Sequence, residues 1–326
     1  MSSNLKQKFA WLVPVADVVF APLLLPASVL MRTVRRKGIA RMPISRSIFR
    51  RVGVFPIWNH YYEPLFETSA LTRSLESDRV LPGLDLNVEG QLSLLSEFTF
   101  QAELDRFPTE RAAPPQFYYH NGNFESGDAE ILYNMIRRFR PSRIIEIGSG
   151  NSTLIAHAAI AENTRSDPSY RCEHICIEPY DHPWLESLPI RIIRERVEKV
   201  PLELFEQLGH NDILFIDSSH VIRPQGDVLF EFQEVLPRVK PGVLVQIHDI
   251  FTPRDYPTSW VVDHVRLWNE QYLVESFLAF NDRFQIIAAL NFLAHHHPAE
   301  LGAACPVFGR EAGSSEPASL WVRRVA

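Results

Sequence analysis

Residues 143–153 read Arg-Ile-Ile-Glu-Ile-Gly-Ser-Gly-Asn-Ser-Thr, a short apolar run that ends in two closely spaced glycines. Together with the helical pattern of 152–162, it predicts a buried strand, a tight turn and a helix. Glycines 148 and 150 would permit the tight turn and the close approach of a ligand. The third position of the dinucleotide fingerprint should be Gly or Ala, and it is Thr153 here, which counts against a typical NAD site.

Outward from this stretch, the same alternation of strands and helices continues. Further strands are expected at 174–178, 190–197, 212–217 and 242–249, and later at 284–290 and 319–325. Helical periodicity is found at 128–138, 202–208, 227–236 and 260–273. Alternating strands and helices indicate βαβ units and a parallel sheet covered on both faces. The fold class is therefore predicted to be α/β and Rossmann-like.

The composition is that of an ordinary globular protein. Of 326 residues, 46% are hydrophobic and 22% are charged, which argues against wholesale disorder and against a polytopic membrane protein. Cys172, Cys176 and Cys305 are too few for a disulfide framework. We interpret them as buried, reduced thiols, which suits a reducing compartment.

Charge is distributed unevenly along the chain. Residues 1–62 contain ten Lys/Arg and one acid, Asp17, so they carry +9, and the remainder carries −15 of the net −6. An acidic body argues against a nucleic-acid reader that uses its whole surface. The basic segment points instead to an interaction local to the N-terminus.

Three interpretations of the N-terminal segment remain open. Residues 9–31 are apolar apart from Asp17, and a basic run from Arg32 to Arg51 follows them. Such a pair of segments favours an anionic membrane surface, which residues 9–51 would contact. If the segment spans the bilayer, the positive charge after it places the body in the cytoplasm. The alternatives are an apolar helix packed on the body or on a second subunit, and a cleaved signal peptide.

Several predicted strands end in polar residues. In a parallel sheet, ligands bind outside the carboxyl ends of the strands. The second strand ends in Glu178, whose carboxylate could accept hydrogen bonds from two ribose hydroxyls; the alternative is a solvated carboxylate. The fourth strand ends Asp217-Ser-Ser-His220, and the fifth ends His248-Asp249.

With these residues in order, 128–326 resembles the class I S-adenosylmethionine-dependent methyltransferases. The resemblance is strongest to the small-molecule branch whose fourth strand reads Ile-Asp-x-x-His and whose fifth ends in His-Asp. It implies a seven-stranded sheet, mostly parallel, with an antiparallel strand near the C-terminus. It also implies S-adenosyl-L-methionine as the cofactor.

The resemblance also implies roles for individual residues. Gly148 and Gly150 would pack against the cofactor, Glu146 would lie near its methionine end, and Glu178 would bind the ribose. Asp128 would help to hold the methionine portion, with helix N-capping as the alternative. The other positions that would line the cofactor site are Ser149, Ser152, Val197, Asp217 and Ser218.

His220, His248 and Asp249 are the candidate catalytic residues. An unperturbed histidine has a pKa of about 6.5, and His220 follows a strand end, so it could deprotonate an acceptor; the alternative is a structural histidine. In the macrolide-sugar O-methyltransferases and the cephalosporin-hydroxylase-like proteins, acids at comparable strand ends bind a divalent metal. The resemblance therefore makes Asp217 and Asp249 candidate ligands of Mg²⁺, although His248 stands where those relatives have an acid.

The sequence thus predicts three regions: 1–51, an apolar and basic segment; 52–127, a cap or substrate region; and 128–326, a methyltransferase domain. The predicted activity is O-methylation of a small or lipid-linked hydroxyl-bearing acceptor, with His220 and Asp249 at the reaction centre. Alternatives are a metal-dependent hydroxylase-like enzyme and a non-catalytic membrane-associated scaffold. A homo-oligomer is a further expectation, and a nucleic-acid partner is not expected.

Overall fold

The computed structural model describes residues 12–111, 115–311 and 315–326, and the chain divides after Thr72 into two compact units. This division differs from the predicted boundaries at 51 and 127. Leu95, Leu104 and Phe124 are buried in the same core as the strands, so residues 73–127 belong to the sheet-containing unit. Their apolar side chains complete the core of that unit, and the prediction that 52–127 form a cap or substrate region stays a prediction.

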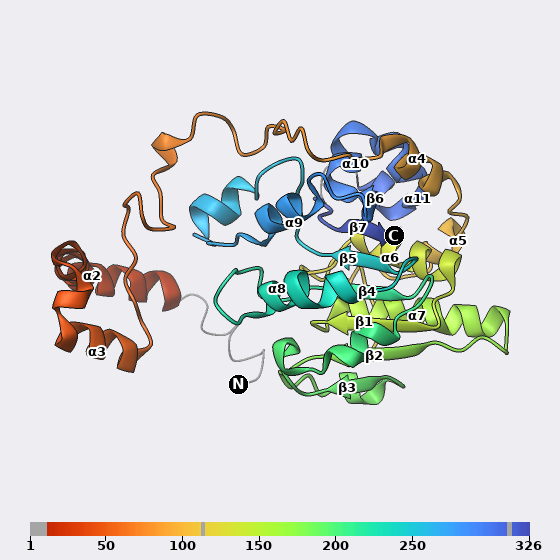
Figure 1. Ribbon diagram of the computed structural model, residues 1–326, viewed down its shortest axis with the longest axis horizontal. Coiled ribbons are helices and arrows are strands. Elements are labelled where there is room, and N and C mark those ends of the chain that lie inside the picture. The colour runs from red at the N-terminus through yellow and green to blue at the C-terminus, as the bar shows by residue number, and fades with distance from the viewer. Residues whose placement is uncertain (1–11, 112–114, 312–314) are drawn as a thin grey trace. The chain divides into compact units, whose positions relative to one another are not determined.

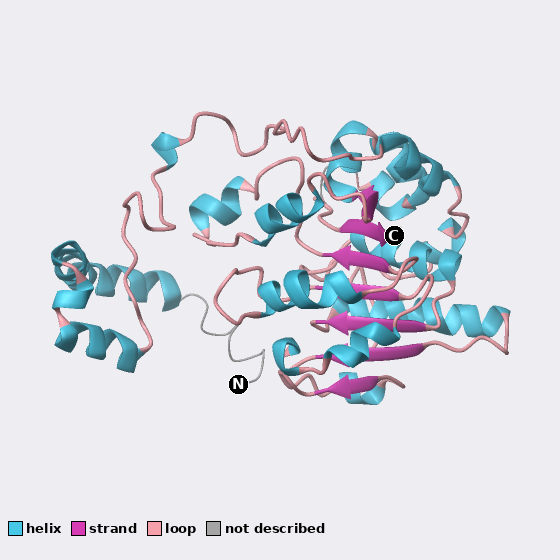
Figure 2. Ribbon diagram, viewed as in Figure 1, coloured by secondary structure: helices cyan, strands magenta, loops and turns pink. Residues whose placement is uncertain are grey.

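The larger unit is built on one seven-stranded sheet (Figures 1 and 2). The strands are β1 (Arg143–Ile147), β2 (Glu173–Ile177), β3 (Arg191–Ile193), β4 (Ile213–Ile216), β5 (Leu244–Ile247), β6 (Phe284–Ala289) and β7 (Leu320–Arg324). Their order is β3-β2-β1-β4-β5-β7-β6. β1 to β5 are parallel, whereas β7 is antiparallel to both β5 and β6. The predicted Rossmann-like sheet with an antiparallel C-terminal strand is confirmed.

Helices and single turns connect these strands. In the larger unit the α-helices are α4 (Val88–Ser96), α5 (Gln101–Leu104), α6 (Asp128–Phe139), α7 (Asn151–Ser166), α8 (Asp227–Phe230), α9 (Glu270–Leu278), α10 (Leu290–His296), α11 (Pro298–Ala304) and α12 (Pro306–Arg310). The shorter turns are η3 (Leu185–Ser187), η4 (Val197–Lys199), η5 (Leu202–Gln207), η6 (Glu231–Val235), η7 (Leu236–Arg238) and η8 (Ser259–Asp263).

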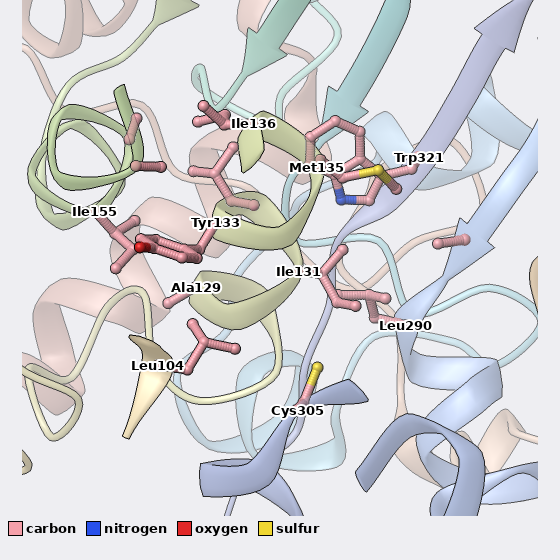
Figure 3. Packing of buried hydrophobic residues seen from close by; sticks show 14 of the residues in the cluster. Leu104, Ala129, Ile131, Tyr133, Met135, Ile136, Ile155, Leu290, Cys305 and Trp321 are labelled. Carbon is pink, nitrogen blue, oxygen red and sulfur yellow. The ribbon is translucent and has the colours of Figure 1, made fainter. Parts of the chain in front are cut away.

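Two hydrophobic cores lie on opposite faces of the sheet. The alternation of side chains along β1 sends Ile144 into one core and Ile145 and Ile147 into the other. Figure 3 shows part of the first core, where α6 contributes Ile131 and Met135 close to Trp321 of β7. Because both faces are covered, only the ends of the strands are available for a ligand.

The prediction of one continuous helix over 260–273 is wrong for residues 264–269, which are not helical. The chain forms the wide turn η8, leaves the helical conformation, and begins α9 only at Glu270. Val265 adopts a left-handed φ of 51°, which a β-branched residue in a continuous helix cannot have. The Arg266 guanidinium lies over the rings of Trp260 and Trp268, at 4.2 and 4.5 Å from their centroids, and so holds this connection in place.

The smaller unit is helical in its described part. Its elements are α2 (Leu12–Lys37), η1 (Ile39–Arg41), α3 (Pro43–Val52) and η2 (Thr68–Ala70). α2 continues through Pro22 and Pro26. The 25 residues Val13–Lys37 are long and apolar enough to cross a membrane, and the apolar window within them is 0% buried.

Candidate active site

The turn after β1 brings the ends of β1 and β4 into close contact. Gly148 has a φ of 79°, and a Cβ built there would lie 2.1 Å from the carbonyl oxygen of Asp217. Only glycine can satisfy both conditions. Gly150 differs, because its φ of −171° is accessible to any residue and a Cβ built there would meet no atom within 4 Å. The protein itself does not require glycine at 150, so that position is open for a ligand.

Glu178 lies at the edge of a cavity of about 520 Å³, which Gly148, Val197, Asp217 and Ser218 also line. The Glu178 carboxylate is buried, and its two oxygens accept backbone N–H bonds from Ser149 (3.1 Å) and Tyr180 (2.8 Å). Each oxygen keeps a free lone pair. The carboxylate is therefore held in a fixed orientation with acceptor capacity left over.

A second cavity, of about 470 Å³, lies on the other side of the glycine turn. Ser149, Gly150 and Ser152 line it, and Asp217 lines both cavities. Phe124 contributes a wall from the segment before α6. Asp217 is therefore the residue at which the two cavities meet.

His220, Asp217 and Asp249 converge at the ends of β4 and β5. The Nε2 atom of His220 lies 3.2 Å from Asp217 Oδ1 and 3.5 Å from Asp249 Oδ2. His220 and Asp249 both have left-handed backbones, with φ values of 59° and 58°. Such conformations cost free energy in non-glycine residues and are concentrated at functional sites.

Glu270, the first residue of α9, fixes the orientation of the His220 ring. Its Oε2 lies 2.8 Å from His220 Nδ1, so Nε2 is the nitrogen that faces the two aspartates. Burial opposes a positive charge on the ring, but Asp217 and Glu270 outweigh it and raise the pKa of His220 well above its usual value. The ring of Trp268 lies 4.2 Å from the His220 ring, centroid to centroid.

His248 completes the cluster from the end of β5. Its Nδ1 is buried without a hydrogen-bond partner, at 3.6 Å from Asp217 Oδ1 and 3.7 Å from Asp249 Oδ1. Burial disfavours the charged ring, but Asp249 and Asp217 raise the pKa of His248 to about 10. Burial likewise opposes ionisation of Asp217, yet the two histidines hold the pKa of Asp217 below its usual value. The four side chains form a site that stabilises positive charge.

Glu146 does not lie where the resemblance placed it. Its carboxylate points into the protein, where Ser152 Oγ (2.5 Å) and Thr153 Oγ1 (2.8 Å) donate to it. His174 Nε2 lies 3.0 Å and Cys176 Sγ 3.4 Å from the same carboxylate. It lines neither of the two cavities. The expected contact with the cofactor is corrected to a supporting position beneath the glycine turn.

Loss of this support should be costly. We expect Glu146→Ala to lower the free energy of unfolding by about 3–5 kcal/mol, since it leaves two hydroxyls and a buried imidazole without their acceptor. Urea unfolding measures the change. Glu173→Ala, on the neighbouring strand β2, is the control, and loss of its partly exposed pair with Arg143 should cost less than about 1 kcal/mol. Equal losses in the two variants would contradict the supporting role.

Asp128 also differs from its expected role. It is in the first turn of α6, but Gly127 is the N-cap, and the Asp128 carboxylate accepts backbone N–H bonds from Ala318 and Ser319 at 3.1 and 2.7 Å. It therefore fastens the start of β7 to α6, and it lines neither cavity. The alternative of N-capping is corrected, whereas a contact with the methionine portion stays a prediction. Asp128 Oδ2 lies 4.0 Å from His248 Nε2, so Asp128 is on the other side of the His248 ring from Asp217 and Asp249.

Two residues of the site escaped the sequence analysis. Glu270 and Trp268 were expected inside a continuous helix, with no particular role. The backbone N–H groups of Asn269 and Glu270 donate to the carbonyl oxygen of His220 at 3.0 and 3.2 Å, which fixes the start of α9 against the loop after β4. No local pattern reveals this contact, because it joins positions 50 residues apart.

The comparisons with known proteins agree with this fold. Residues 145–250 match the family described as "Methyltransferase domain". An uncharacterized protein of Archaeoglobus fulgidus is 33% identical over 181 residues, which cover 51% of this chain and 80% of that protein. The matched residues 145–250 run from β1 to the end of β5, the parallel part of the sheet. The chain belongs to the same family as the Archaeoglobus fulgidus protein.

Two solved structures are also similar to the chain. One is a putative protein-L-isoaspartate O-methyltransferase from Plasmodium falciparum in complex with S-adenosyl-L-homocysteine, with 19% identity, a TM-score of 0.25 and coverage of 36% of this chain and 56% of that one. The other is MycE methyltransferase in complex with Mg, SAH and mycinamycin VI, with 17% identity, a TM-score of 0.31 and coverage of 58% and 47%. The chain spans about half the length of each of these proteins.

Proposed function

We propose that the protein is an S-adenosylmethionine-dependent methyltransferase that methylates a hydroxyl oxygen of a small or lipid-linked acceptor. One observation carries this proposal. Asp217 lines both the cavity beside Glu178 and the cavity beyond the glycine turn, and it also contacts His220. A cofactor site and a candidate base therefore meet at one residue.

The first cavity fits the cofactor. The Glu178 carboxylate has two oxygens, each with a free lone pair, and this matches the adjacent hydroxyls of a ribose. Val197 supplies an apolar surface in the same cavity, suited to the adenine. Gly150 leaves room at the turn where a side chain would project into open space. When bound, S-adenosylmethionine would supply an electrophilic methyl group; the bond from the acceptor oxygen to the methyl carbon would form as the bond from that carbon to the sulfonium sulfur breaks, and S-adenosylhomocysteine would be the leaving group.

His220 is the proposed base. Methyl transfer to a hydroxyl oxygen releases one proton, and His220 Nε2 lies 3.2 Å from Asp217 Oδ1, whose residue lines the second cavity. Glu270 holds the ring by Nδ1 and stabilises the imidazolium that forms. Asp217 and Asp249 flank Nε2 and would stabilise the imidazolium once the single hydroxyl proton of the acceptor is on the ring.

The cluster also fits a divalent cation. Single ligand atoms of Asp217, His248 and Asp249 lie within 4.8 Å of one another, and the Nδ1 of His248 is buried without a partner. These three residues would hold the ion. Oxygen ligands suit Mg²⁺, whereas an imidazole ligand shifts the preference toward transition metals such as Mn²⁺. A bound cation would supply Lewis-acid stabilisation of the acceptor oxygen.

Glu178 provides the direct test of the cofactor site. We expect Glu178→Ala to weaken the binding of S-adenosylhomocysteine tenfold or more in calorimetry, since each lost charge-assisted hydrogen bond contributes about 1.5–3 kcal/mol. Glu178→Gln should also bind more weakly, because one of its two acceptors becomes a donor. Glu206→Ala, an exposed acid on η5, is the control and should bind as the wild type does. No binding by the wild type at millimolar ligand would overturn the proposal.

A further inference from the structure

The described part of the N-terminal unit exposes an unusual amount of apolar surface. Along α2 the valines and leucines point outward all round the helix, with Val18 at 73% and Leu25 at 72% exposure. Soluble monomeric proteins rarely leave contiguous apolar patches of this kind uncovered. A helix that is apolar all round is typical of a buried or membrane-embedded segment. α2 therefore requires an apolar environment.

The length of α2 fits a bilayer. Its apolar part, residues 13–31, rises about 1.5 Å per residue and so measures about 28 Å, against about 30 Å for a hydrocarbon core. Pro22 and Pro26 lie inside the helix without interrupting it. Pro is more frequent in transmembrane helices than in soluble ones, so these two residues do not oppose the assignment.

α3 has the pattern of a helix that lies at a membrane surface. Ile44, Ile48 and Val52 are spaced four residues apart, share one face, and are 76%, 55% and 69% exposed. Arg46 and Arg50, also four residues apart, lie on a different face. An exposed apolar face opposite a basic one is the arrangement of interfacial amphipathic helices.

Aromatic residues follow α3 directly. Trp58 stacks on His60, and Tyr61 and Tyr62 are 91% and 85% exposed. Arg35, at the end of α2, lies over the ring of Phe55 and pairs with Glu63, so the end of α2 is joined to this aromatic segment. Trp and Tyr are enriched at the level of lipid headgroups.

The charges of this segment favour an anionic lipid surface. Between Val18 and Tyr62 the chain contains no acid, and eight Lys/Arg lie from Arg32 to Arg51. Basic residues beside an apolar helix attract anionic lipids within a Debye length of the surface. Along the chain the apolar helix comes first, then the amphipathic helix, and then the aromatic segment. This is the order expected of a chain that passes from the hydrocarbon core into the headgroup layer.

We infer that residues 12–62 anchor the protein in an anionic lipid bilayer. α2 is embedded in the hydrocarbon core, and Arg32–Tyr62 lie in the headgroup layer, with the apolar face of α3 toward the acyl chains. The inference is independent of the proposed methyl transfer, because it rests only on residues of the N-terminal unit.

The test uses full-length protein reconstituted into vesicles and floated on a density gradient. We expect flotation with phosphatidylcholine–phosphatidylglycerol vesicles and resistance to extraction by alkaline carbonate. The variant Arg46→Gln/Arg50→Gln/Arg51→Gln should still float, but partition into anionic vesicles about a hundredfold more weakly than the wild type, at about fivefold per arginine. Val19→Asp/Leu23→Asp should abolish carbonate resistance, because charges in the hydrocarbon core are costly.

The matched control is Arg165→Gln/Arg191→Gln/Arg283→Gln, which removes three exposed arginines from the larger unit and should leave partitioning unchanged. Thermal unfolding followed by circular dichroism shows that each variant still folds. Three results would overturn the inference: failure of the wild type to float, equal partitioning of the Arg46/Arg50/Arg51 variant and the wild type, or a stable dimer without lipid that Val19→Asp/Leu23→Asp dissociates. The last result would assign α2 to a second copy of the chain.

Discussion

Gly148→Ala is expected to lower the melting temperature by roughly 6–12 °C and to abolish binding of S-adenosylhomocysteine. The loss of stability and the loss of binding both come from the Cβ atom that the substitution adds. A Cβ at this position would lie 2.1 Å from the carbonyl oxygen of Asp217, and the backbone φ is 79°. Left-handed backbone costs a residue with a side chain about 1–2 kcal/mol, and overpacking adds about 1–3 kcal/mol. Relief of the clash would have to move β1 away from β4, and so would displace Asp217.

Gly150→Ala is the matched comparison, two residues away in the same turn. Its backbone suits alanine and its Cβ would meet no protein atom, so its melting temperature should stay close to that of the wild type. Its binding of S-adenosylhomocysteine should fall by up to about a hundredfold, because about 3 kcal/mol is the upper range for a misplaced methyl group in a packed contact.

Thermal unfolding and calorimetry on both variants separate the two roles. If Gly148→Ala is as stable as the wild type, the close approach of β1 and β4 is not required by the fold. If Gly150→Ala binds the ligand with unchanged affinity, the open space at 150 is not part of the cofactor site. Either result would change the assignment of one glycine without affecting that of the other.

The sheet was predictable because each strand is a short apolar run bounded by polar residues. The central strands β1, β2 and β4 begin and end within one residue of the predicted limits. β3 is the exception, since the run 190–197 forms a strand only over 191–193 and then the turn η4. β3 is an edge strand with one neighbour, β2, so its pairing ends where that of β2 ends.

The convergence of site residues was predictable from topology. The carboxyl ends of parallel strands meet at one edge, and this places Glu178, Asp217 and Asp249 near one another whatever the loops do. The direction of Glu146 also had a signal that the analysis missed. Glu146 lies within β1 rather than at its end, and alternation places it on the same face as Ile144, which packs in the core containing α7.

The partners of His220 could not be predicted in the same way. Glu270 is an acid in an apolar stretch, and local periodicity placed it within a helix that the structure shows to be interrupted. Its proximity to His220 depends on the left-handed Val265 and on the packing of Arg266 between two tryptophans. Such contacts depend on tertiary packing, which can override local propensity.

His220→Ala is expected to reduce methyl transfer by about 10²–10⁴-fold while leaving S-adenosylhomocysteine binding within about twofold of the wild type. His220 contacts Asp217, which lines both cavities, but His220 itself lines neither of them. Incubation of purified protein with an extract and labelled cofactor measures transfer as label in product. Glu206→Ala is the control. Full transfer by His220→Ala would remove His220 from the reaction, and lost binding would show that it holds the cofactor site together.

Glu270→Gln tests whether the carboxylate behind His220 tunes the base rather than only holding the fold. Asp217 and Glu270 raise the pKa of His220, so the neutral, proton-accepting ring becomes more abundant as the pH rises through that pKa. Removing the charge of Glu270 lowers the pKa of His220. The acidic limb of the pH–rate profile should therefore shift to lower pH, whereas a merely structural change would reduce the rate equally at every pH. An unshifted limb in a folded, ligand-binding Glu270→Gln variant would contradict the positioning role, because the Oε2–Nδ1 contact at 2.8 Å would then have no influence on the proton that His220 exchanges.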